Sequence, residues 1–535
     1  GGNPVFVNTT IVNNSCSGNG GAVYFDIGYN LTLVNSIIWE NSPNNMYFND
    51  SNDPSTVTIS YSNIEGGQAS IVTNDNGTIN WGSGNIDADP MFADTANSNY
   101  HLLASSQCIN AGHPDSTDSD GTIADMGAYP YLNTYSGPTW YITESGNDTT
   151  ATGASGDPFR SIQAGINFSN NNDSVTVASG TYVENIVFPT ELHNQYNHNI
   201  KVLGENQATT IIDGNNNGPV VHFGKYLYSD YVLDGFTIQN GSGDDFGSFN
   251  EGGGIYIDEN YSSVILKNIT VTNNTAQHGG GIYCGMYSSF TLSNSTISNN
   301  ISTRMGGGIF IESSSSGFEI SDVIITENIC TGYSGGGIVV THATANITNC
   351  IISHNTAQTG GSGGSLLHAN TTWNNCLFYE NQDPSGGDAY SASQSSESVF
   401  INCTFADNKT GSTINIGYGA DIIFINSILW NEDIPEISWN NYTDSVNTVT
   451  FLNTAVDGGQ AEIDSSYGIE QNTANWLMGN IDTYPVFADS ANDDYSLADL
   501  SPAISAAASE VTIDGVSYIL TNTDIEGNPR INPGG

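Results

Sequence analysis

Two adjacent carboxylates are the most direct candidates for acid–base chemistry in this chain. Asp244 and Asp245 occur in the glycine- and serine-containing stretch 241–245. Hydrolysis of a glycosidic bond needs two carboxyl groups about 5–10 Å apart. Consecutive residues in a loop usually point apart, so we expect both side chains to be solvated. No catalytic residue is assigned from the sequence.

The chain has few cationic residues, and its coil-region histidines do not cluster by repeat position. The net charge is −48, and the whole cationic set is Arg160, Lys201, Lys225, Lys267, Arg304, Lys409 and Arg530. A lyase acting on a polyanion would repel its substrate, and phosphate backbones need clustered cations. The coil-region histidines share no repeat position: His278, His342, His354 and His368. The composition therefore excludes nucleic acid, disfavours an anionic membrane, and predicts a protein that is not an enzyme.

One loop has the oxygen donors that calcium prefers. Asp115, Asp118, Asp120 and Asp125 surround Gly121 with alternating carboxylates. Only part of a calcium-loop spacing is present. The loop is therefore predicted either to bind Ca²⁺ or to be simply solvated, and no other cofactor is implied.

Three aromatic residues recur one coil apart. Tyr256, Tyr283 and Phe310 each follow a Gly-Ile step. In stacked coils these rings are predicted to point outward and to form a ladder. Such a ladder either stabilises its own sheet or offers a platform for sugar rings or a partner surface.

The elements that position these residues follow from a repeat of about 27 residues. Gly-Gly-Gly-Ile occurs four times, ending at Ile255, Ile282, Ile309 and Ile338, and a second marker runs in phase with it: Asn274, Asn300, Asn328, Asn355, Asn381 and Asn408. A fixed period of this length predicts a solenoid. Each asparagine is expected to hydrogen-bond its own copies above and below. The glycines allow φ > 0 and close backbone approach.

Three cysteines share one repeat position. Cys350, Cys376 and Cys403 each follow an asparagine. Equal positions in stacked coils predict a column of small buried thiols. A disulfide between stacked neighbours is allowed by distance but disfavoured by side-chain direction.

The chain contains a partial internal duplication. Residues 35–39 match 426–430, and residues 84–94 match 479–489. Residues 1–135 are thus predicted to be the C-terminal part of one β-helix module. Residues 136–535 would be a nearly complete second module, with an N-terminal cap (136–200), coils (201–455) and C-terminal loops (456–535). Both ends lie inside modules, so the chain is expected to be a piece of a tandem array.

The predicted cap contains a short helix. Asp157 before Pro158 is a favourable N-cap, and Phe159, Ile162 and Ile166 share one helical face. Such a helix would close the open end of a solenoid core.

The coils resemble a known family of repeats. Phe378-Tyr379-Glu380-Asn381, Phe405-Ala406-Asp407-Asn408 and Gly20-Gly21-Ala22-Val23 are similar to the repeats of polymorphic outer-membrane proteins. The second module also resembles right-handed parallel β-helix proteins of the pectate-lyase-like superfamily. The resemblance implies an all-β, right-handed parallel β-helix solenoid. It also implies surface proteins and adhesins more than one chemistry, because the superfamily includes lyases and hydrolases.

The sequence thus predicts a non-enzymatic, secreted, cell-surface structural or adhesive protein. Its partners would be further tandem modules or copies of itself, and fibre formation is an open alternative. No apolar run reaches 18 residues, so no membrane span is expected. The alternative is a carbohydrate-binding or carbohydrate-cleaving β-helix. Glycans or other cell-surface components would then be the partners.

Overall fold

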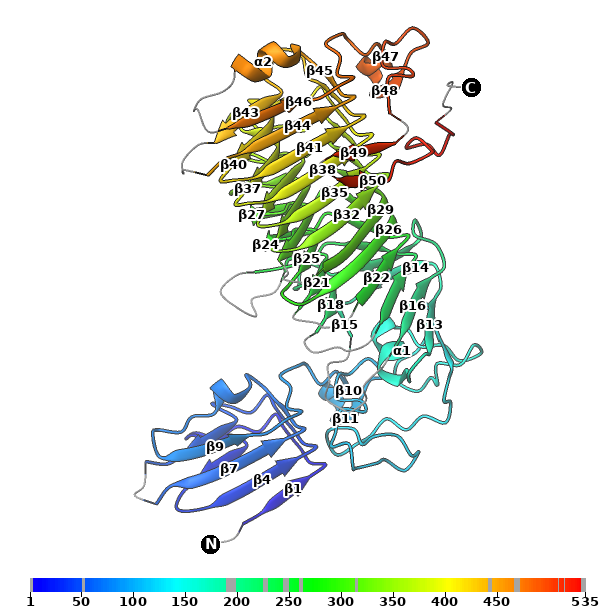
Figure 1. Cartoon of the computed structure of the whole chain (residues 1–535). Coiled ribbons are helices and arrows are strands. Elements are labelled where there is room, and N and C mark those ends of the chain that lie inside the picture. Colours follow the sequence, from blue (N-terminus) through cyan, green and yellow to red (C-terminus); the bar gives the residue numbers. More distant parts are fainter. Residues whose placement is uncertain are drawn as a thin grey trace. The chain divides into compact units, whose positions relative to one another are not determined.

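A computed structural model of the chain describes residues 3–50, 53–188, 199–224, 230–243, 250–258, 263–312, 316–440, 445–465, 472–508, 510–513 and 515–530. Its backbone forms two compact units. Unit 1 holds residues 1–182 and 188–205, and unit 2 holds residues 183–187 and 206–535. Nearly all regular structure is β-strand (Figure 1). None of the helices in these ranges has the length and hydropathy of a membrane span.

Unit 2 is a right-handed parallel β-helix, as the repeat and the family resemblance together led us to expect. Each coil contributes short strands to faces on which strands of successive coils pair in parallel. The ten-stranded face comprises β15 (Ile186–Phe188), β18 (Val221–Phe223), β21 (Ile255–Ile257), β25 (Ile282–Cys284), β28 (Ile309–Glu312), β31 (Ile338–Thr341), β34 (Gly364–Leu367), β37 (Asp388–Ser393), β40 (Ser412–Gly417) and β43 (Ile437–Asn440).

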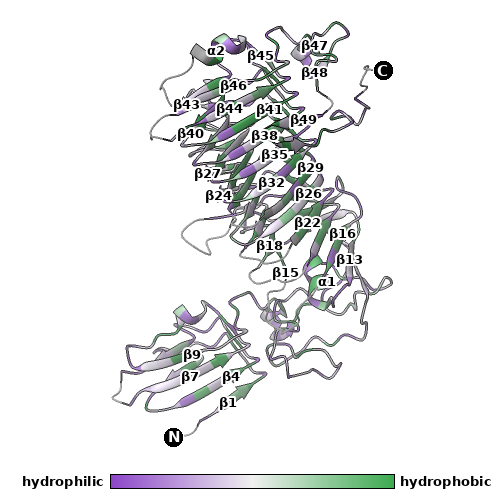
Figure 2. Cartoon of the chain, viewed as in Figure 1, coloured by the Kyte–Doolittle hydropathy of each residue, from purple (hydrophilic) through white to green (hydrophobic). Residues whose placement is uncertain are grey.

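Two further series of strands complete the coils of unit 2. The first is β19 (Tyr231–Asp234), β22 (Ser263–Lys267), β26 (Ser289–Ser298), β29 (Ser316–Thr326), β32 (Thr344–Thr348), β35 (Asn370–Asn374), β38 (Glu397–Ile401), β41 (Asp421–Ile425), β44 (Thr448–Leu452) and β46 (Thr473–Trp476). The second is β17 (Thr210–Asp213), β20 (Thr237–Gln239), β23 (Thr270–Thr272), β33 (Ile351–Ser353), β36 (Leu377–Tyr379), β39 (Thr404–Ala406), β42 (Ile428–Trp430) and β45 (Ala455–Val456), with β26 and β29 spanning both series. Apolar residues recur along these strands (Figure 2).

Four elements in the described part of unit 2 lie outside its main faces. A small sheet joins β24 (Thr275–His278), β27 (Ile301–Met305) and β30 (Ile329–Cys330). The C-terminal region has more structure than the predicted loops. It contains α2 (Gly459–Ser465), the hairpin of β47 (Phe487–Asp489) with β48 (Asp494–Leu497), and the hairpin of β49 (Val511–Ile513) with β50 (Val516–Tyr518).

Unit 1 contains the shorter first set of coils and the cap. The coil strands are β1 (Val5–Val7), β2 (Thr10–Val12), β3 (Val23–Phe25), β4 (Asn30–Val34), β5 (Ile37–Trp39), β6 (Met46–Phe48), β7 (Ser55–Ser60), β8 (Asn63–Ile64) and β9 (Gly77–Trp81). These are followed by β10 (Phe92–Asp94), β11 (Asn99–Leu102), β12 (Thr139–Ile142), α1 (Ile162–Phe168), β13 (Ser174–Val177), β14 (Gly180–Val183) and β16 (Lys201–Gly204).

The cap helix exists but begins later than predicted. Its N-cap is Ser161, whose Oγ accepts a hydrogen bond from the Ala164 amide. Asp157 instead accepts from the Thr152 amide in the preceding turn. Phe159 forms a bridge to Ile142 of β12, which holds it in extended backbone. Because the bridge keeps residues 157–160 out of the helix, α1 starts at Ile162.

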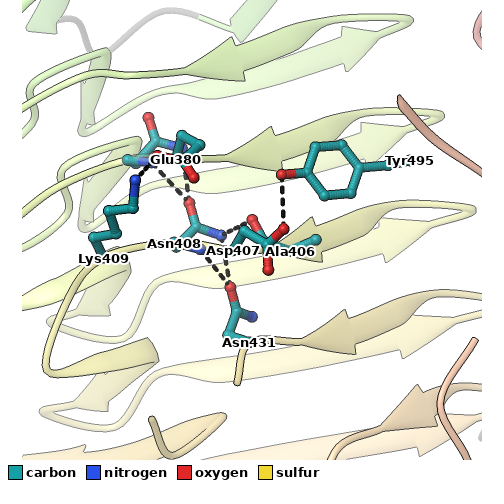
Figure 3. A network of polar contacts seen from close by, with 8 residues as sticks. Glu380, Ala406, Asp407, Asn408, Lys409, Asn431 and Tyr495 are labelled. Atoms are coloured by element: carbon teal, nitrogen blue, oxygen red, sulfur yellow. Dashed lines mark hydrogen bonds and ion pairs between the residues drawn. The ribbon is translucent and has the colours of Figure 1, made fainter. Parts of the chain in front are cut away.

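An inner asparagine ladder runs through unit 2, as the repeat predicted. In each rung the main-chain amide and Nδ2 of one asparagine donate to Oδ1 of the asparagine in the next coil, at 2.8–3.2 Å. The rungs are Asn274, Asn300, Asn328, Asn355, Asn381, Asn408 and Asn431. All seven side chains are buried, and Glu436 accepts the last two hydrogen bonds. Figure 3 shows the Asn408–Asn431 rung.

The glycine triplets form another corner of each coil, where the backbones of successive coils approach closely. The first glycine of each triplet has φ near +60 to +77°. A Cβ on Gly308, the third of its triplet, would lie 2.6 Å from the Gly337 carbonyl oxygen of the next coil. Only residues without a side chain allow this spacing.

Substitution of the third glycine is therefore expected to destabilise unit 2. We predict that Gly308→Ala lowers the free energy of unfolding by about 1–3 kcal/mol, because the methyl group overlaps a fixed backbone oxygen. The control is Gly156→Ala, because nothing lies within 4 Å of the Cβ position of Gly156. Gly317 also has open space there, but its φ of +100° would strain an alanine. Equal urea midpoints for both variants would contradict the prediction.

Candidate functional site

The predicted aromatic ladder forms on the ten-stranded face of unit 2. Tyr256 and Tyr283 have ring centroids 5.5 Å apart, and Tyr283 and Phe310 stack at 5.7 Å. His222 of β18 extends the ladder, stacking on Tyr256 at 5.0 Å. The residues on either side of the two tyrosine rings and the phenylalanine ring, which are isoleucines apart from Cys284, are fully buried, as expected from strand alternation.

The ladder is not the open platform that the sequence allowed. Tyr256 and Tyr283 are 6% exposed and Phe310 is 4% exposed. Their ring faces stack on one another, and Met305 and Leu367 pack against the cluster. The rings therefore stabilise the sheet, and no ring face is free to receive a sugar.

Polar groups gather at the edge of the ladder. The Tyr283 hydroxyl donates to Glu312 Oε2 at 3.1 Å. His278 stacks on Phe310 at 5.2 Å, and its Nδ1 lies 3.7 Å from Glu251 Oε1. Burial, followed by the charges of Glu251 and Glu312, holds the pKa of Tyr283 well above its ordinary value. Sequence reasoning compared His278 only with the other histidines and missed this pair. The signal was present, because Glu251 and His278 each precede a glycine triplet, one coil apart, and the two residues form a parallel bridge.

The four aspartates of the predicted calcium loop do not converge. Asp125 accepts from the Asn110 and Tyr131 amides, and Asp118 accepts from the Asp125 amide. The other two differ: Asp120 accepts from Thr122 and Asn133, whereas the side chain of Asp115 is 94% exposed. In the described ranges no group of three or more His, Cys, Asp or Glu could hold a metal ion. Calcium binding here remains a prediction without a ligand set.

Burial and hydrogen bonds together set the pKa values of the aspartates in this loop. Burial raises the pKa of Asp125 to about 8, and the two amides that donate to it offset only part of this effect. Burial also raises the pKa of Asp118. For Asp120 the donors from Asn133 and Thr122 outweigh burial, so its pKa lies below the ordinary value. The loop thus uses its carboxyl groups to satisfy backbone amides.

The other sequence candidates are placed as follows. Asp244 and Asp245 lie outside the described residues. Cys350, Cys376 and Cys403 are buried free thiols, as predicted, with no disulfide between them. Burial holds the pKa of Cys376 well above its ordinary value, which makes a thiolate there unfavourable.

Sequence reasoning missed an outer asparagine corner, formed by Asn375, Asn402, Asn426 and Asn453. These residues have φ between +51 and +62° and lie one coil apart. The described part of residues 506–530 runs along them: Asn426 exchanges hydrogen bonds with Ala508, and Asn375 Nδ2 donates to the Thr523 carbonyl. The signal in the sequence was the asparagine that precedes each of the three stacked cysteines.

The same C-terminal segment covers apolar side chains on the outer face of unit 2. Ile401, Ile425 and Leu452 form a buried cluster with Val511 of β49. The hairpin of β47 and β48 also rests on the coils, since the Tyr495 hydroxyl donates to Asp407 Oδ2 at 3.0 Å (Figure 3). Figure 3 also shows the ion pair between Lys409 and Glu380.

Arg530 anchors residues 506–530. Its Nη2 donates to Asn375 Oδ1 at 2.5 Å and its Nε donates to the Thr523 carbonyl at 3.0 Å. We predict that Arg530→Ala accelerates limited proteolysis within residues 506–530, since hydrogen bonds to a charged group contribute about 1.5–3 kcal/mol. Lys201→Ala, which removes an exposed cation in unit 1, is the control. Unchanged cleavage in Arg530→Ala would contradict this anchoring role.

Comparison with known proteins supports the fold. Residues 144–370 match the family described as "Protein of unknown function (DUF1565)", and residues 8–26 match the Chlamydia polymorphic membrane protein repeat. The second match includes Gly20-Gly21-Ala22-Val23, so the predicted resemblance to these repeats is confirmed. The search of curated proteins found no match.

The chain also matches solved structures at low similarity. Pectate lyase Pel9A is 14% identical, with a TM-score of 0.42, over 72% of this chain and 95% of its own. Alginate lyase from Paenibacillus sp. is 12% identical, with a TM-score of 0.35, over 59% and 96%. Pectin methylesterase from Aspergillus niger is 13% identical, with a TM-score of 0.30, over 64% and 92%. At these values the likeness says nothing about a reaction of this chain.

Proposed function

We propose that the chain is a non-enzymatic, secreted, cell-surface β-helix protein whose tandem modules have a structural or adhesive role. The inner asparagine ladder carries this proposal. It links seven successive coils of unit 2 through buried hydrogen bonds in which each rung both donates and accepts. Such a ladder satisfies the turn amides of every coil, so the solenoid keeps one backbone geometry over its length.

The charge is consistent with an extracellular role. A net charge of −48 keeps an extended protein soluble and discourages collapse of neighbouring modules onto each other. The repeat match at residues 8–26 also supports a surface location, because proteins described by that repeat model are membrane proteins.

Two measurements test this proposal. Antibodies against the chain should label intact cells of the source organism, and protease shaving should remove the label. In single-molecule pulling, unit 2 should unfold in steps of one coil, about 27 residues or roughly 90 Å of extended chain. Labelling only of permeabilised cells, or turnover of a polysaccharide by the purified chain, would overturn the proposal.

Carbohydrate binding or cleavage is the second candidate, and the edge of the aromatic ladder favours it. Glu251, His278 and Glu312 place two carboxyl groups and an imidazole beside Tyr283. The side chain of Glu251 is 20% exposed, so it can reach a ligand hydroxyl group. Binding on a glycan array that Glu312→Gln or Tyr283→Phe weakens would favour recognition. Turnover lost in Glu251→Gln or Asp245→Asn would favour an enzyme.

A further inference from the structure

One segment of the chain occurs twice with the same backbone. In unit 1, β10 and β11 pair Phe92 with Leu102. In unit 2, β47 and β48 pair Phe487 with Leu497, and each pairing has the same irregularity. The offset is 395 residues at every position, which matches the internal duplication. We call residues 91–109 the first tail and residues 486–504 the second tail.

The hydrogen bonds after the hairpins also coincide. The Ser106 amide donates to the Leu103 carbonyl, and the Ser501 amide donates to the Ala498 carbonyl, both at 2.9 Å. The Ser106 hydroxyl accepts from the Cys108 amide at 3.1 Å, and the Ser501 hydroxyl accepts from the Ala503 amide at 3.2 Å. Since the two tails share one local structure, any difference in exposure reflects what covers them.

The two tails differ sharply in exposure. Three positions in the first tail are buried, and their counterparts in the second tail are exposed. The pairs are Leu102 at 3% and Leu497 at 36%, Ser105 at 5% and Leu500 at 90%, and Ile109 at 5% and Ile504 at 47%. Three aliphatic side chains on one short segment form an exposed apolar surface, which we call the terminal face (Leu497, Leu500 and Ile504).

The first tail is hydrogen-bonded to the N-terminal cap that follows it in unit 1. Asn167 of α1 donates through Nδ2 to the Ala104 carbonyl at 2.9 Å and to the Ser106 carbonyl at 2.8 Å. The Ala104 amide donates to the Asp148 carbonyl at 2.8 Å. The Asp148 carboxylate in turn accepts from the Ser161 amide at the start of α1. The end of one module and the cap of the next thus form one hydrogen-bonded junction, all within unit 1.

We propose that the terminal face is a docking surface for the N-terminal cap of a further β-helix module. This rests on the proposed function, in which modules occur in tandem. The occupant is a cap like residues 139–177, with a side-chain amide in its helix positioned as Asn167 is. In the described part of unit 2 the Ser501 carbonyl accepts the Ile504 amide, whereas its counterpart Ser106 also accepts from Asn167.

The second tail also defines what its cap must offer. Asp499 stands where the first tail has the fully buried Ala104, and Leu500 stands in place of Ser105. A cap that covers these residues needs a cation or a hydrogen-bond donor opposite Asp499, because a buried carboxylate must be paired. It also needs an apolar recess for Leu500. The terminal face therefore selects a cap of related fold but different surface.

The experiment compares the chain with an extended chain in which residues 130–535 are repeated after residue 535, so that this chain's own cap is the occupant. Both chains carry Asp499→Ala, which restores the residue that the first tail has at this position, and the probe at residue 500 removes the other difference. Leu500→Cys is introduced into both with Cys16→Ser, since the other native cysteines are buried. We expect maleimide labelling of Leu500→Cys to slow at least tenfold in the extended chain. Ile519→Cys, 86% exposed outside the terminal face, should label equally in both. Equal labelling of Leu500→Cys in both chains would overturn the proposal.

A second measurement needs no extension and stays informative if the extended chain does not fold. In the original chain, Ser105→Cys should label at least tenfold more slowly than Leu500→Cys, and adding Asn167→Ala should accelerate it. If Ser105→Cys labels as fast as Leu500→Cys, the cap does not cover the first tail and the proposal fails. These readouts do not depend on surface labelling or polysaccharide turnover, so the proposed function can fail independently.

Discussion

Asn328→Ala is expected to lower the free energy of unfolding of unit 2 by about 3–5 kcal/mol. Asn328 is fully buried in the middle of the inner asparagine ladder. Its Oδ1 accepts from the amide and Nδ2 of Asn300, and its own Nδ2 donates to the Ile297 carbonyl and to Asn355. Alanine leaves several of these groups buried without a partner, and each such group costs about 1–3 kcal/mol.

The measurement is urea unfolding of the full chain, followed by a probe in unit 2. Asn346→Ala is the matched control, because Asn346 is an exposed asparagine whose Nδ2 donates to Glu319. Its loss should cost less than about 0.5 kcal/mol, as for most surface substitutions. If the two variants unfold at the same urea concentration, the ladder does not stabilise the coils.

Unit 2 is expected to be less stable at pH 8 than at pH 5. Burial raises the pKa of Asp388 to about 7 and that of Glu436 to about 8. Because these values exceed those of the unfolded chain, the folded state binds more protons between about pH 4 and pH 8. The free energy of unfolding is therefore largest below about pH 4 and falls as pH rises through this window. Each group contributes on the order of 4 kcal/mol.

Repulsion among the many acidic groups also lowers the free energy of unfolding as pH rises. The test therefore asks whether one specific substitution flattens the dependence of this free energy on pH. Asp388→Asn should flatten the dependence of unfolding free energy on pH between 4 and 7. Glu510→Gln removes the same charge from an exposed position and should leave the slope unchanged. The measurement is thermal unfolding of both variants and of the unmodified chain across pH 4–8. An unaltered slope in Asp388→Asn would show that this carboxyl group is ionised throughout.

Local repetition accounts for what could be predicted about the fold. The interval between Asn274 and Asn300 equals one coil, so equal positions must stack, and the hydrogen bonds between their side chains follow. For the same reason, the glycine corners, the aromatic ladder and the column of buried thiols could be predicted from equal repeat positions. It was less successful for the start of α1, because the bridge from Phe159 to Ile142 is a tertiary contact that overrides the favourable capping sequence at Asp157.

The candidate site was predicted only in part. The sequence identified Tyr256, Tyr283 and Phe310 as a stack, but it did not predict that Met305 and Leu367 pack against them. The aspartates of residues 115–125 were identified from their spacing, yet the structure uses three of them as acceptors for backbone amides. Spacing along the chain does not reveal which donors will reach a side chain.

The sequence by itself determined the β-helix, its period and its ladders, because a parallel solenoid places each residue beside its own copy in the next coil. Only the tertiary structure decided what lies over the coils. The outer asparagine corner binds residues 506–530, and the first tail is covered by a cap whose contacts, such as Asn167 with Ala104, join residues about 60 positions apart. Such contacts follow no period, and they depend on the path of the chain after it leaves the coils.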